Sequence, residues 1–334
     1  MSLKCDAVFQ GGGVKGIGLV GAVAAVEKAG YEFVNVAGSS AGAIISALLA
    51  VGYNSEELRV ELKKLDYTKL KQKNFLDKLG TLGKTLSIII NYGVYNADYF
   101  ENWLESLLRR KNKTRFKDIK TDFNEEKYRY KFNAIASDLT ERKMLVLPGD
   151  LKQFGFDPDD FAIAKAVRMS MSIPVFFEPF KLKDIDGKEH IIVDGGLLSN
   201  YPIWLLDDNS KNPTWPTFGF KFSTDIKDDH NQTGGYEQVD VIKNIFNYIM
   251  SLLNTMLDAH DKYHVSTSSG DFERTILISN KLGNGVNMKR EQIGTTDFDI
   301  TQEECDELFS NGFSSAEKFL ARWNFGDWVE KYRN

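Results

Sequence analysis

The chain has 334 residues, of which 42% are hydrophobic and 27% are charged, a composition typical of a folded globular protein of one or two domains. Its formal net charge of −5 gives no general attraction to nucleic acid, and two cysteines, Cys5 and Cys305, are too few for a disulfide framework or a zinc site. The first residues lack a secretory signal pattern, and no apolar run reaches the roughly 20 residues of a membrane span, so we expect a cytoplasmic protein whose membrane contacts are peripheral.

The first 50 residues alternate between apolar strands and small-residue helices. The pattern predicts a strand at 5–10, a helix at 17–29 ended by Gly30, a strand at 33–37 and a helix at 41–51 ended by Gly52. Asn54 and Glu57 have the spacing of a capping box for a third helix. This order predicts a parallel sheet with both faces covered.

Residues 66–124 break the alternation. They begin with a lysine-rich stretch and continue with apolar residues at helical spacing, namely Tyr99, Phe100, Trp103, Leu104, Leu107 and Leu108. Asp98 is the predicted N-cap of that helix. We therefore expect an inserted helical cap over 66–124.

The α/β pattern resumes after the insertion. It predicts strands at 128–136 and 144–147, a helix at 161–171, strands at 191–193 and 217–222, a long helix at 236–264 and a strand at 275–278. Thr301 and Glu304 have the spacing of a capping box that starts the C-terminal helices.

Three consecutive glycines follow the first strand. Gly11, Gly13 and Gly16 match the dinucleotide pattern G-x-G-x-x-G, but that site also needs an acidic residue at the end of the next strand. The next strand ends in Gly38, and Glu32 lies at its start, so a dinucleotide is disfavoured. A P-loop is also disfavoured because no G-K-[ST] closes the loop.

The second strand leads into "GSSAG", residues 38–42, which is a G-x-S-x-G motif between a strand and a helix. Glycines on both sides allow a sharp turn, and Ser40 is predicted to stand exposed at the positive end of the helix. A structural Gly/Ser turn is the alternative. Backbone N–H groups of residues 11–13 can lie beside Ser40, which would make the glycine loop an oxyanion hole.

A serine nucleophile needs a base. The four histidines, at positions 190, 230, 260 and 264, stand in no catalytic motif; His260 and His264 are expected on a helix surface, and His190 at the start of a strand. Asp194 ends the apolar run "IIVD" and is followed by Gly195 and Gly196, which places a carboxylate at the carboxyl end of a strand. A common D-G turn is the alternative.

The order "GGGVKG", "GSSAG", "DGG" resembles the patatin-like phospholipase family, whose members are lipid acyl hydrolases with a Ser–Asp dyad. The segments "ASDLTERKMLVL" and "AVRMSMSIPVFFEP" also resemble blocks of that family, so the resemblance covers about residues 7–202. Gln10 is a departure, because plant patatins carry Asp before the glycines.

The resemblance implies a three-layer α/β/α fold with a mostly parallel central sheet. It implies that Ser40 is the nucleophile, Asp194 the base, and Gly11, Gly12 and Gly13 the oxyanion loop, supported by Lys15, Gly38, Gly42, Gly195 and Gly196. No cofactor or metal is needed for this chemistry, and the acidic run Asp157–Asp160 is interpreted as a helix cap. An aspartate of ordinary pKa, near 3.9, would be a weak base for a serine hydroxyl.

We expect one domain over 1–334, with a catalytic core at about 5–205, the insertion at about 66–124 and a C-terminal extension at about 205–334. The expected partners are a lipid substrate and a membrane surface. Two alternatives are a transacylase or acyltransferase using the same serine, and a non-catalytic lipid-binding protein. The acyltransferases with the related malonyl-transferase fold pair their serine with a histidine, which the D-G-G motif argues against.

The stretch from Arg59 to Lys84 is strongly basic. Eight basic residues stand against three acidic ones, with leucines and Phe75 interspersed. This pattern predicts binding to an anionic membrane surface, and a solvated helical face is the alternative.

Overall fold

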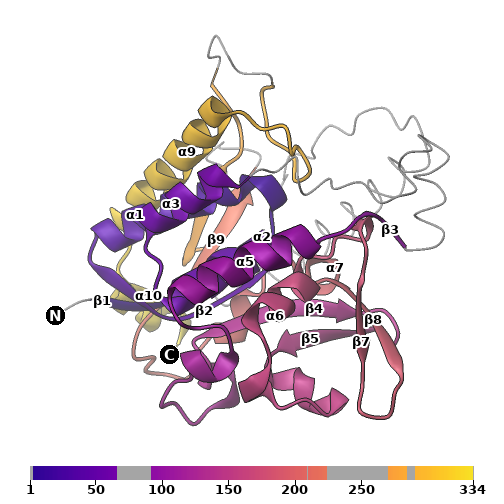
Figure 1. Ribbon diagram of the computed structural model, residues 1–334. Helices are drawn as coiled ribbons and strands as arrows, with labels where there is room; N and C mark the ends of the chain where they lie inside the picture. The colour runs from indigo at the N-terminus through magenta and orange to yellow at the C-terminus, as the bar shows by residue number, and fades with distance from the viewer. Residues whose placement is uncertain (1–2, 66–91, 209, 224–269, 284–289, 334) are drawn as a thin grey trace.

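The computed structural model describes residues 3–65, 92–208, 210–223, 270–283 and 290–333. These residues form an eight-stranded sheet with helices packed against it (Figure 1). The predicted helix at 236–264 and the lysine-rich start of the predicted insertion lie outside the described residues.

The strands of the main sheet are β1 (Leu3–Phe9), β2 (Tyr31–Ser39), β4 (Phe132–Asp138), β5 (Lys143–Leu147), β7 (Phe180–Lys183), β8 (Glu189–Asp194), β9 (Thr217–Ser223) and β10 (Thr275–Ser279). β3 (Gly93–Tyr95) and β6 (Val175–Phe177) form a separate pair. The helices are α1 (Gly16–Lys28), α2 (Ala41–Val51), α3 (Ser55–Lys64), α5 (Asp98–Arg110), α6 (Ile163–Ser170), α7 (Gly196–Ser199), α9 (Gln302–Leu320) and α10 (Phe325–Tyr332).

The main sheet is mixed and mostly parallel. Its order is β10-β9-β1-β2-β4-β8-β7, with β5 also paired to β4. The pairs from β10 to β4 are parallel, whereas β4–β5, β4–β8 and β7–β8 are antiparallel. The predicted parallel sheet is therefore confirmed for its first half. In the antiparallel half, short hairpins join β4 to β5 and β7 to β8, whereas β4 and β8 pair across a long connection.

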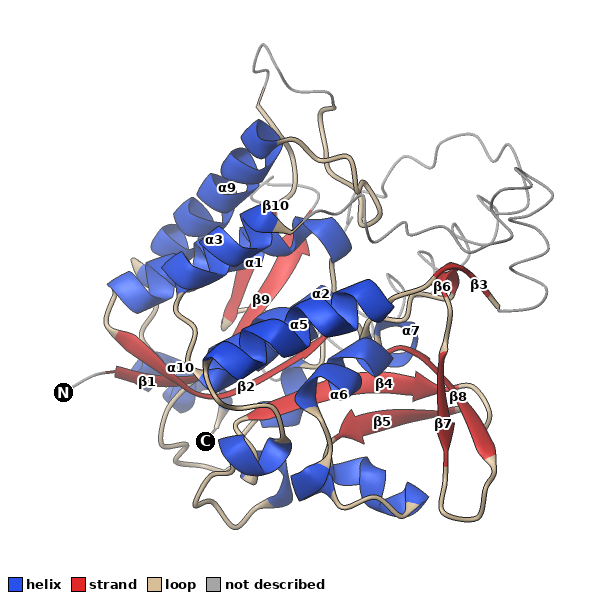
Figure 2. Cartoon of the chain, viewed as in Figure 1, coloured by secondary structure: helices blue, strands red, loops and turns tan. Residues whose placement is uncertain are grey.

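Alternate side chains of β1 serve two different cores. Cys5, Ala7 and Phe9 face the larger core, which the long helices cover, whereas Val8 faces a smaller one under the 3-10 helix 203–206. Figure 2 shows the long helices lying across the sheet, with α10 on its far side. Burial of both faces explains why these strands read as continuous apolar runs.

Several predicted boundaries are confirmed. α2 spans 41–51 as predicted, and Gly52 ends it with φ of 102° in the left-handed region. The capping boxes of Asn54 with Glu57 and of Thr301 with Glu304 are both present. β4 starts at Phe132 instead of 128, because a 3-10 helix takes residues 126–128. No helix within the described ranges is both long and apolar enough to cross a bilayer.

The described part of the predicted insertion packs as part of the helical layer. Its helix, α5, buries Phe100, Leu104, Leu107 and Leu108 in the larger core beside α6. The apolar stripe seen in the sequence therefore faces the protein's own core and does not stand apart as a cap. Asp98 is the first helical residue and not the N-cap; its N–H donates to the side-chain oxygen of Asn96 over 2.7 Å.

Two of the basic residues predicted to face a membrane are paired inside the chain. Arg59 and Lys63, both on α3, contact the Asp306 carboxylate of α9 at 3.1 and 2.6 Å. Residues 66–84 of the basic stretch lie outside the described residues. The part that is described therefore serves helix packing.

The C-terminal part of the chain is built into the same sheet and the same core. β9 and β10 extend the sheet beyond β1, and α9 packs on α1. The two helices meet at glycines: a Cβ on Gly21 would lie 2.0 Å from the Phe309 carbonyl oxygen, and one on Gly312 would lie 1.9 Å from that of Gly18. This close contact fixes α1, which begins directly after the glycine loop.

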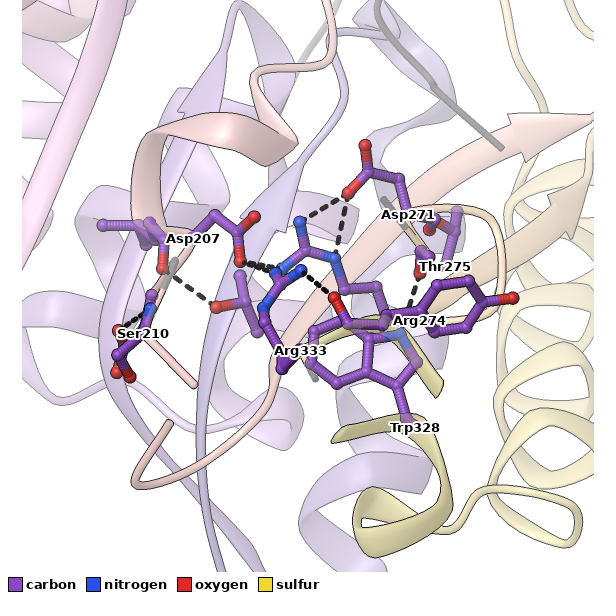
Figure 3. Close-up of polar contacts among 12 residues, drawn as sticks. Asp207, Ser210, Asp271, Arg274, Thr275, Trp328 and Arg333 are labelled. Carbon is purple, nitrogen blue, oxygen red and sulfur yellow. Dashed lines mark hydrogen bonds and ion pairs between the residues drawn. The ribbon is translucent and has the colours of Figure 1, made fainter. Parts of the chain in front are cut away.

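A buried ionic cluster fastens the C-terminal helix to the sheet (Figure 3). The Arg274 guanidinium, 1% exposed, contacts Asp207 at 2.8 Å and Asp271 at 2.5 Å, and Arg333 contacts Asp207 at 2.6 Å. Both guanidinium groups lie over the Trp328 ring of α10. Two cations thus balance two carboxylates away from water.

We expect Arg274→Met to destabilise the protein by about 3–5 kcal/mol, because it leaves Asp271 buried without its cation. The measurement is the urea-unfolding free energy. Lys28→Met is the matched comparison: it removes a 3.0 Å pair with Glu317 that lies in solvent, and should cost less than about 1 kcal/mol. Equal costs for the two variants would contradict a structural role for the cluster.

Candidate active site

The "GSSAG" motif forms a strained turn between β2 and α2. Ser40 has φ 51° and ψ −122°, a conformation that non-glycine residues rarely adopt. The flanking glycines make the turn possible: a Cβ on Gly42 would lie 2.2 Å from the Phe9 carbonyl oxygen, and one on Gly38 would lie 2.5 Å from the Gly42 carbonyl carbon. The predicted strand–turn–helix context of the serine is confirmed.

Ser40 is buried, which differs from the exposed position predicted for it. Only 6% of the residue is exposed. The glycine loop covers it, since a Cβ on Gly11 would lie 3.2 Å from the Ser40 Cβ. The serine still precedes the first turn of α2, where unpaired N–H groups and the helix dipole favour negative charge.

The register of β4 brings Ser40 and Asp194 together. β5 pairs with one edge of β4 over residues 134–138, so β2 and β8 must share the other edge. On that edge Ser39 of β2 is opposite Ile135, and Asp194 of β8 is opposite Ala136. The two strands therefore meet end to end, with the serine turn and the aspartate at the junction.

Asp194 is a buried carboxylate. Burial raises its pKa to about 6, although the nearby Ser40 hydroxyl and the Gly196 N–H, which donates to Oδ1 over 2.7 Å, act to lower it. Oδ2 accepts no hydrogen bond of normal geometry from the described residues. That oxygen is the one with capacity to accept a proton from Ser40.

Gly195 allows the end of β8, with Asp194, to approach β4 closely. A Cβ at position 195 would lie 2.1 Å from the Ile135 carbonyl oxygen, so any larger residue would push the strand end away from β4. Gly196 begins α7 and supplies the N–H that holds Oδ1. The two glycines after Asp194 therefore have separate roles.

The glycine loop offers two N–H groups, not three. The Gly11 N–H donates to the Asn200 carbonyl oxygen over 3.0 Å, so it is not available as the oxyanion donor predicted for it. Gly12 and Gly13 precede and start a short 3-10 helix, where N–H groups have no intrahelical partner. Among the described residues no acceptor is found for either of these two N–H groups.

Residues far along the chain support this loop. A Cβ on Gly12 would lie 2.4 Å from the Phe222 ring, and one on Gly13, at φ 55°, would lie 2.0 Å from the Thr295 carbonyl oxygen. The same carbonyl accepts the Val14 N–H at 3.2 Å, and the Lys15 ammonium lies 5.1 Å from the centre of the Phe222 ring. Nothing in the sequence near Phe222 or Thr295 signals this role.

Gln10, the departure from the plant patatins, also braces the loop. Its side-chain oxygen accepts the Phe222 N–H over 2.7 Å, and the residue is 8% exposed. An amide at this position therefore joins the end of β1 to the end of β9. The presence of glutamine at position 10 is therefore explained by this hydrogen bond.

The histidine that the structure describes is bound elsewhere. His190 lies in β8, as predicted, and is buried with Nδ1 2.9 Å from Asp138 and Nε2 3.3 Å from Asp184. Both ring nitrogens are thus engaged by carboxylates other than Asp194. The other three histidines lie outside the described residues.

Within the described residues, no group of three or more His, Cys, Asp or Glu side chains is arranged to hold a metal ion. The acidic run at 157–160 caps a short helix, as predicted: the Asp157 side chain accepts the Asp159 N–H. Lys120 pairs with Asp159, and Lys117 pairs with Asp160.

Comparison with known proteins shows the family of the chain. A family model described as Patatin-like phospholipase matches residues 7–207. The uncharacterized protein YqhO of Bacillus subtilis is 37% identical over 96% of this chain and 99% of its own length. A probable lipid hydrolase, 463L of Invertebrate iridescent virus 6, is 29% identical over 62% of this chain and 67% of its own.

The crystal structure of VipD from Legionella pneumophila has a similar fold. It superposes with a TM-score of 0.51 at 17% identity, over 95% of this chain and 66% of VipD. The chain thus spans about two thirds of that protein.

Proposed function

The chain belongs to the patatin-like phospholipase family, and from this premise we propose that it is a lipid acyl hydrolase in which Ser40 and Asp194 form a catalytic dyad. The observation that carries the proposal is the register of β4, which places the ends of β2 and β8 together. We assign the whole chain to one catalytic domain, because β9, β10 and α9 complete the sheet and support the glycine loop.

In the proposed reaction, Asp194 Oδ2 accepts the Ser40 proton while Oγ attacks the carbonyl carbon of an acyl ester. Negative charge then develops on the carbonyl oxygen, where the Gly12 and Gly13 N–H groups and the start of α2 stabilise it. The tetrahedral intermediate expels the alcohol, which takes the proton from Asp194. Water, deprotonated by the same carboxylate, then attacks the acyl carbon; the bond from that carbon to Ser40 Oγ breaks, and Asp194 returns the proton to Ser40.

The raised pKa of Asp194 supports its assignment as the base. A general base works best when its pKa lies near the working pH, and a pKa of about 6 is closer to neutrality than the ordinary value. The weak base expected from the sequence becomes a stronger one because burial disfavours its charged form.

The acid side of the pH–rate profile is therefore expected to have its midpoint near pH 6. Asp194 must be ionised to accept a proton, so kcat/KM should fall as the pH drops through its pKa. The measurement is kcat/KM for a soluble chromogenic ester between pH 4.5 and 9. A midpoint near pH 4 would contradict the assignment of this buried carboxylate as the base.

Asp6 provides the control for that profile. Burial raises its pKa to about 6 as well, but it lies in the middle of β1 and is held by Asn35. Asp6→Asn should change stability and leave the midpoint of kcat/KM in place. If Asp6→Asn moved the midpoint, the acid limb would report acid-induced loss of structure and not the base.

Product analysis tests the proposed function. The enzyme is incubated with a mixed lipid extract, and products are identified by mass spectrometry, with Ser40→Ala protein as the blank. Free fatty acids that accumulate only with the intact serine support hydrolysis. Acyl chains moved to a second lipid without free acid would favour the transacylase alternative, and an unchanged extract would favour a non-catalytic lipid-binding protein.

We also propose that the substrate is reached at a membrane surface. The support is the basic and apolar composition of the stretch from Arg59 to Lys84. Because Arg59 and Lys63 are paired with Asp306, the proposal depends on the lysines after residue 65, which lie outside the described residues. Flotation with anionic and with neutral vesicles tests it. Equal binding to the two would remove the electrostatic part of the proposal.

A further inference from the structure

The last residue of α6 and the turn that follows it lie between the two proposed catalytic residues. The Ser170 hydroxyl accepts the N–H of Ser40 over 3.1 Å, and the Ser170 carbonyl accepts the N–H of Gly195 over 3.1 Å. Two residues later, the Ser172 carbonyl accepts the N–H of Asp194 over 2.9 Å. One short segment thus hydrogen-bonds to the backbone of both the nucleophile and the base.

This segment is itself held rigidly. Arg168, 5% exposed, donates to the Ser172 hydroxyl and, over 2.8 Å, to the Glu178 carbonyl oxygen. The Ser172 hydroxyl in turn donates to the Arg168 carbonyl over 2.6 Å. Ser170 and Ser172 are fully buried, so no water competes for these contacts.

Ser40 needs such support because its backbone is strained. A residue at φ 51° and ψ −122° keeps that conformation only when its surroundings determine it strongly. The Ser40 N–H is buried, and the Ser170 hydroxyl is the acceptor that satisfies it. Without that acceptor, the buried N–H would be unpaired, and the turn would relax toward a conformation that satisfies it.

We propose that Ser170 is a positioning residue that sets the distance between Ser40 and Asp194. This inference rests on the proposed function, since it concerns the same dyad. Ser170 touches the backbone N–H of the nucleophile and not the reacting atoms, so it acts through Ser40. Its carbonyl bond to Gly195 couples the serine turn to the strand end that carries the base.

The test is Ser170→Ala with Ser137→Ala as a matched control. Both serines are fully buried, and the Ser137 hydroxyl, on β4 opposite Val193, has no hydrogen-bond partner among the described residues. Misplacement of a reacting group by about 1 Å can cost about a hundredfold in rate. We therefore expect kcat to fall about a hundredfold in Ser170→Ala with KM within about twofold, and Ser137→Ala to stay near wild type.

The rate at which a fluorophosphonate labels Ser40 gives a second readout that needs no lipid substrate. It should fall with kcat in Ser170→Ala and partly recover in Ser170→Cys, which keeps a weak acceptor of similar size. Ser170→Cys also serves if Ser170→Ala fails to fold. If a folded Ser170→Ala protein had the wild-type kcat and the wild-type labelling rate, the inference would be overturned. Absence of both activities in the wild-type protein would instead overturn the proposed function.

Discussion

Ser40→Ala is expected to lower kcat for ester hydrolysis by about 10⁵-fold or more and to abolish covalent labelling by a fluorophosphonate. Alanine keeps the Cβ and the backbone requirement of the turn, so the strain at φ 51° is the same in both proteins. The change therefore removes the nucleophile with little effect on folding. Labelling followed by peptide mass spectrometry, together with a thermal-unfolding scan, measures both expectations.

Ser39→Ala is the matched control for the nucleophile. Ser39 is the other serine of the motif, and its hydroxyl already donates to the Ser199 carbonyl oxygen over 2.6 Å. We expect the Ser39→Ala protein to be labelled at Ser40. Labelling that survives in Ser40→Ala and disappears in Ser39→Ala would show that the wrong serine has been assigned.

Asp194→Asn is expected to reduce kcat by about 10³–10⁴-fold and, at the same time, to stabilise the protein above pH 7. Activity is lost because the amide cannot accept the Ser40 proton. In the wild type, ionising the buried carboxyl costs the folded state about 3 kcal/mol, which is the free energy that corresponds to the rise of its pKa from 3.8 to about 6. Stability rises in Asp194→Asn because the amide is not ionised and this cost is absent.

The sign of this effect can be checked through its pH dependence. A raised pKa in the folded protein stabilises it below pH 3.8, and this contribution is lost as the pH rises through about 6. The difference in unfolding free energy between Asp194→Asn and wild type should therefore grow between about pH 4 and pH 6 and level off above about pH 7. A difference that is constant with pH would mean that Asp194 is not perturbed by burial.

The His190→Gln variant tests whether the mechanism uses a Ser–Asp dyad or a triad that includes His190. His190 is held by Asp138 and Asp184, so its loss should affect stability more than kcat. A His190→Gln protein as inactive as Ser40→Ala would replace the proposed dyad with a histidine-dependent mechanism.

The local elements of this protein follow from its sequence to a large extent. The apolar runs, the Gly52 helix end and the two capping boxes predict β1, α1, β2, α2 and the starts of α3 and α9, because these signals depend on neighbouring residues. The predictions that were wrong concern either the ends of elements, such as the start of β4 and the N-cap at Asp98, or packing partners far along the chain. The apolar residues at helical spacing correctly predicted the helix α5. They did not show that the apolar face of this helix packs in the larger core instead of forming a separate cap.

The sequence by itself determined the glycines, the serine and the aspartate of the candidate site. The strings "GGGVKG", "GSSAG" and "DGG" require glycines where the backbone turns or passes closely, and the close contacts at Gly38, Gly42 and Gly195 are the physical reason. Only the tertiary structure decided how that site works. Strand register brings Ser40 and Asp194 together, the Asn200 carbonyl accepts the Gly11 N–H, and burial raises the pKa of Asp194, the proposed base. Each of these depends on contacts between segments distant in sequence, and on desolvation that exists only once those segments are packed together.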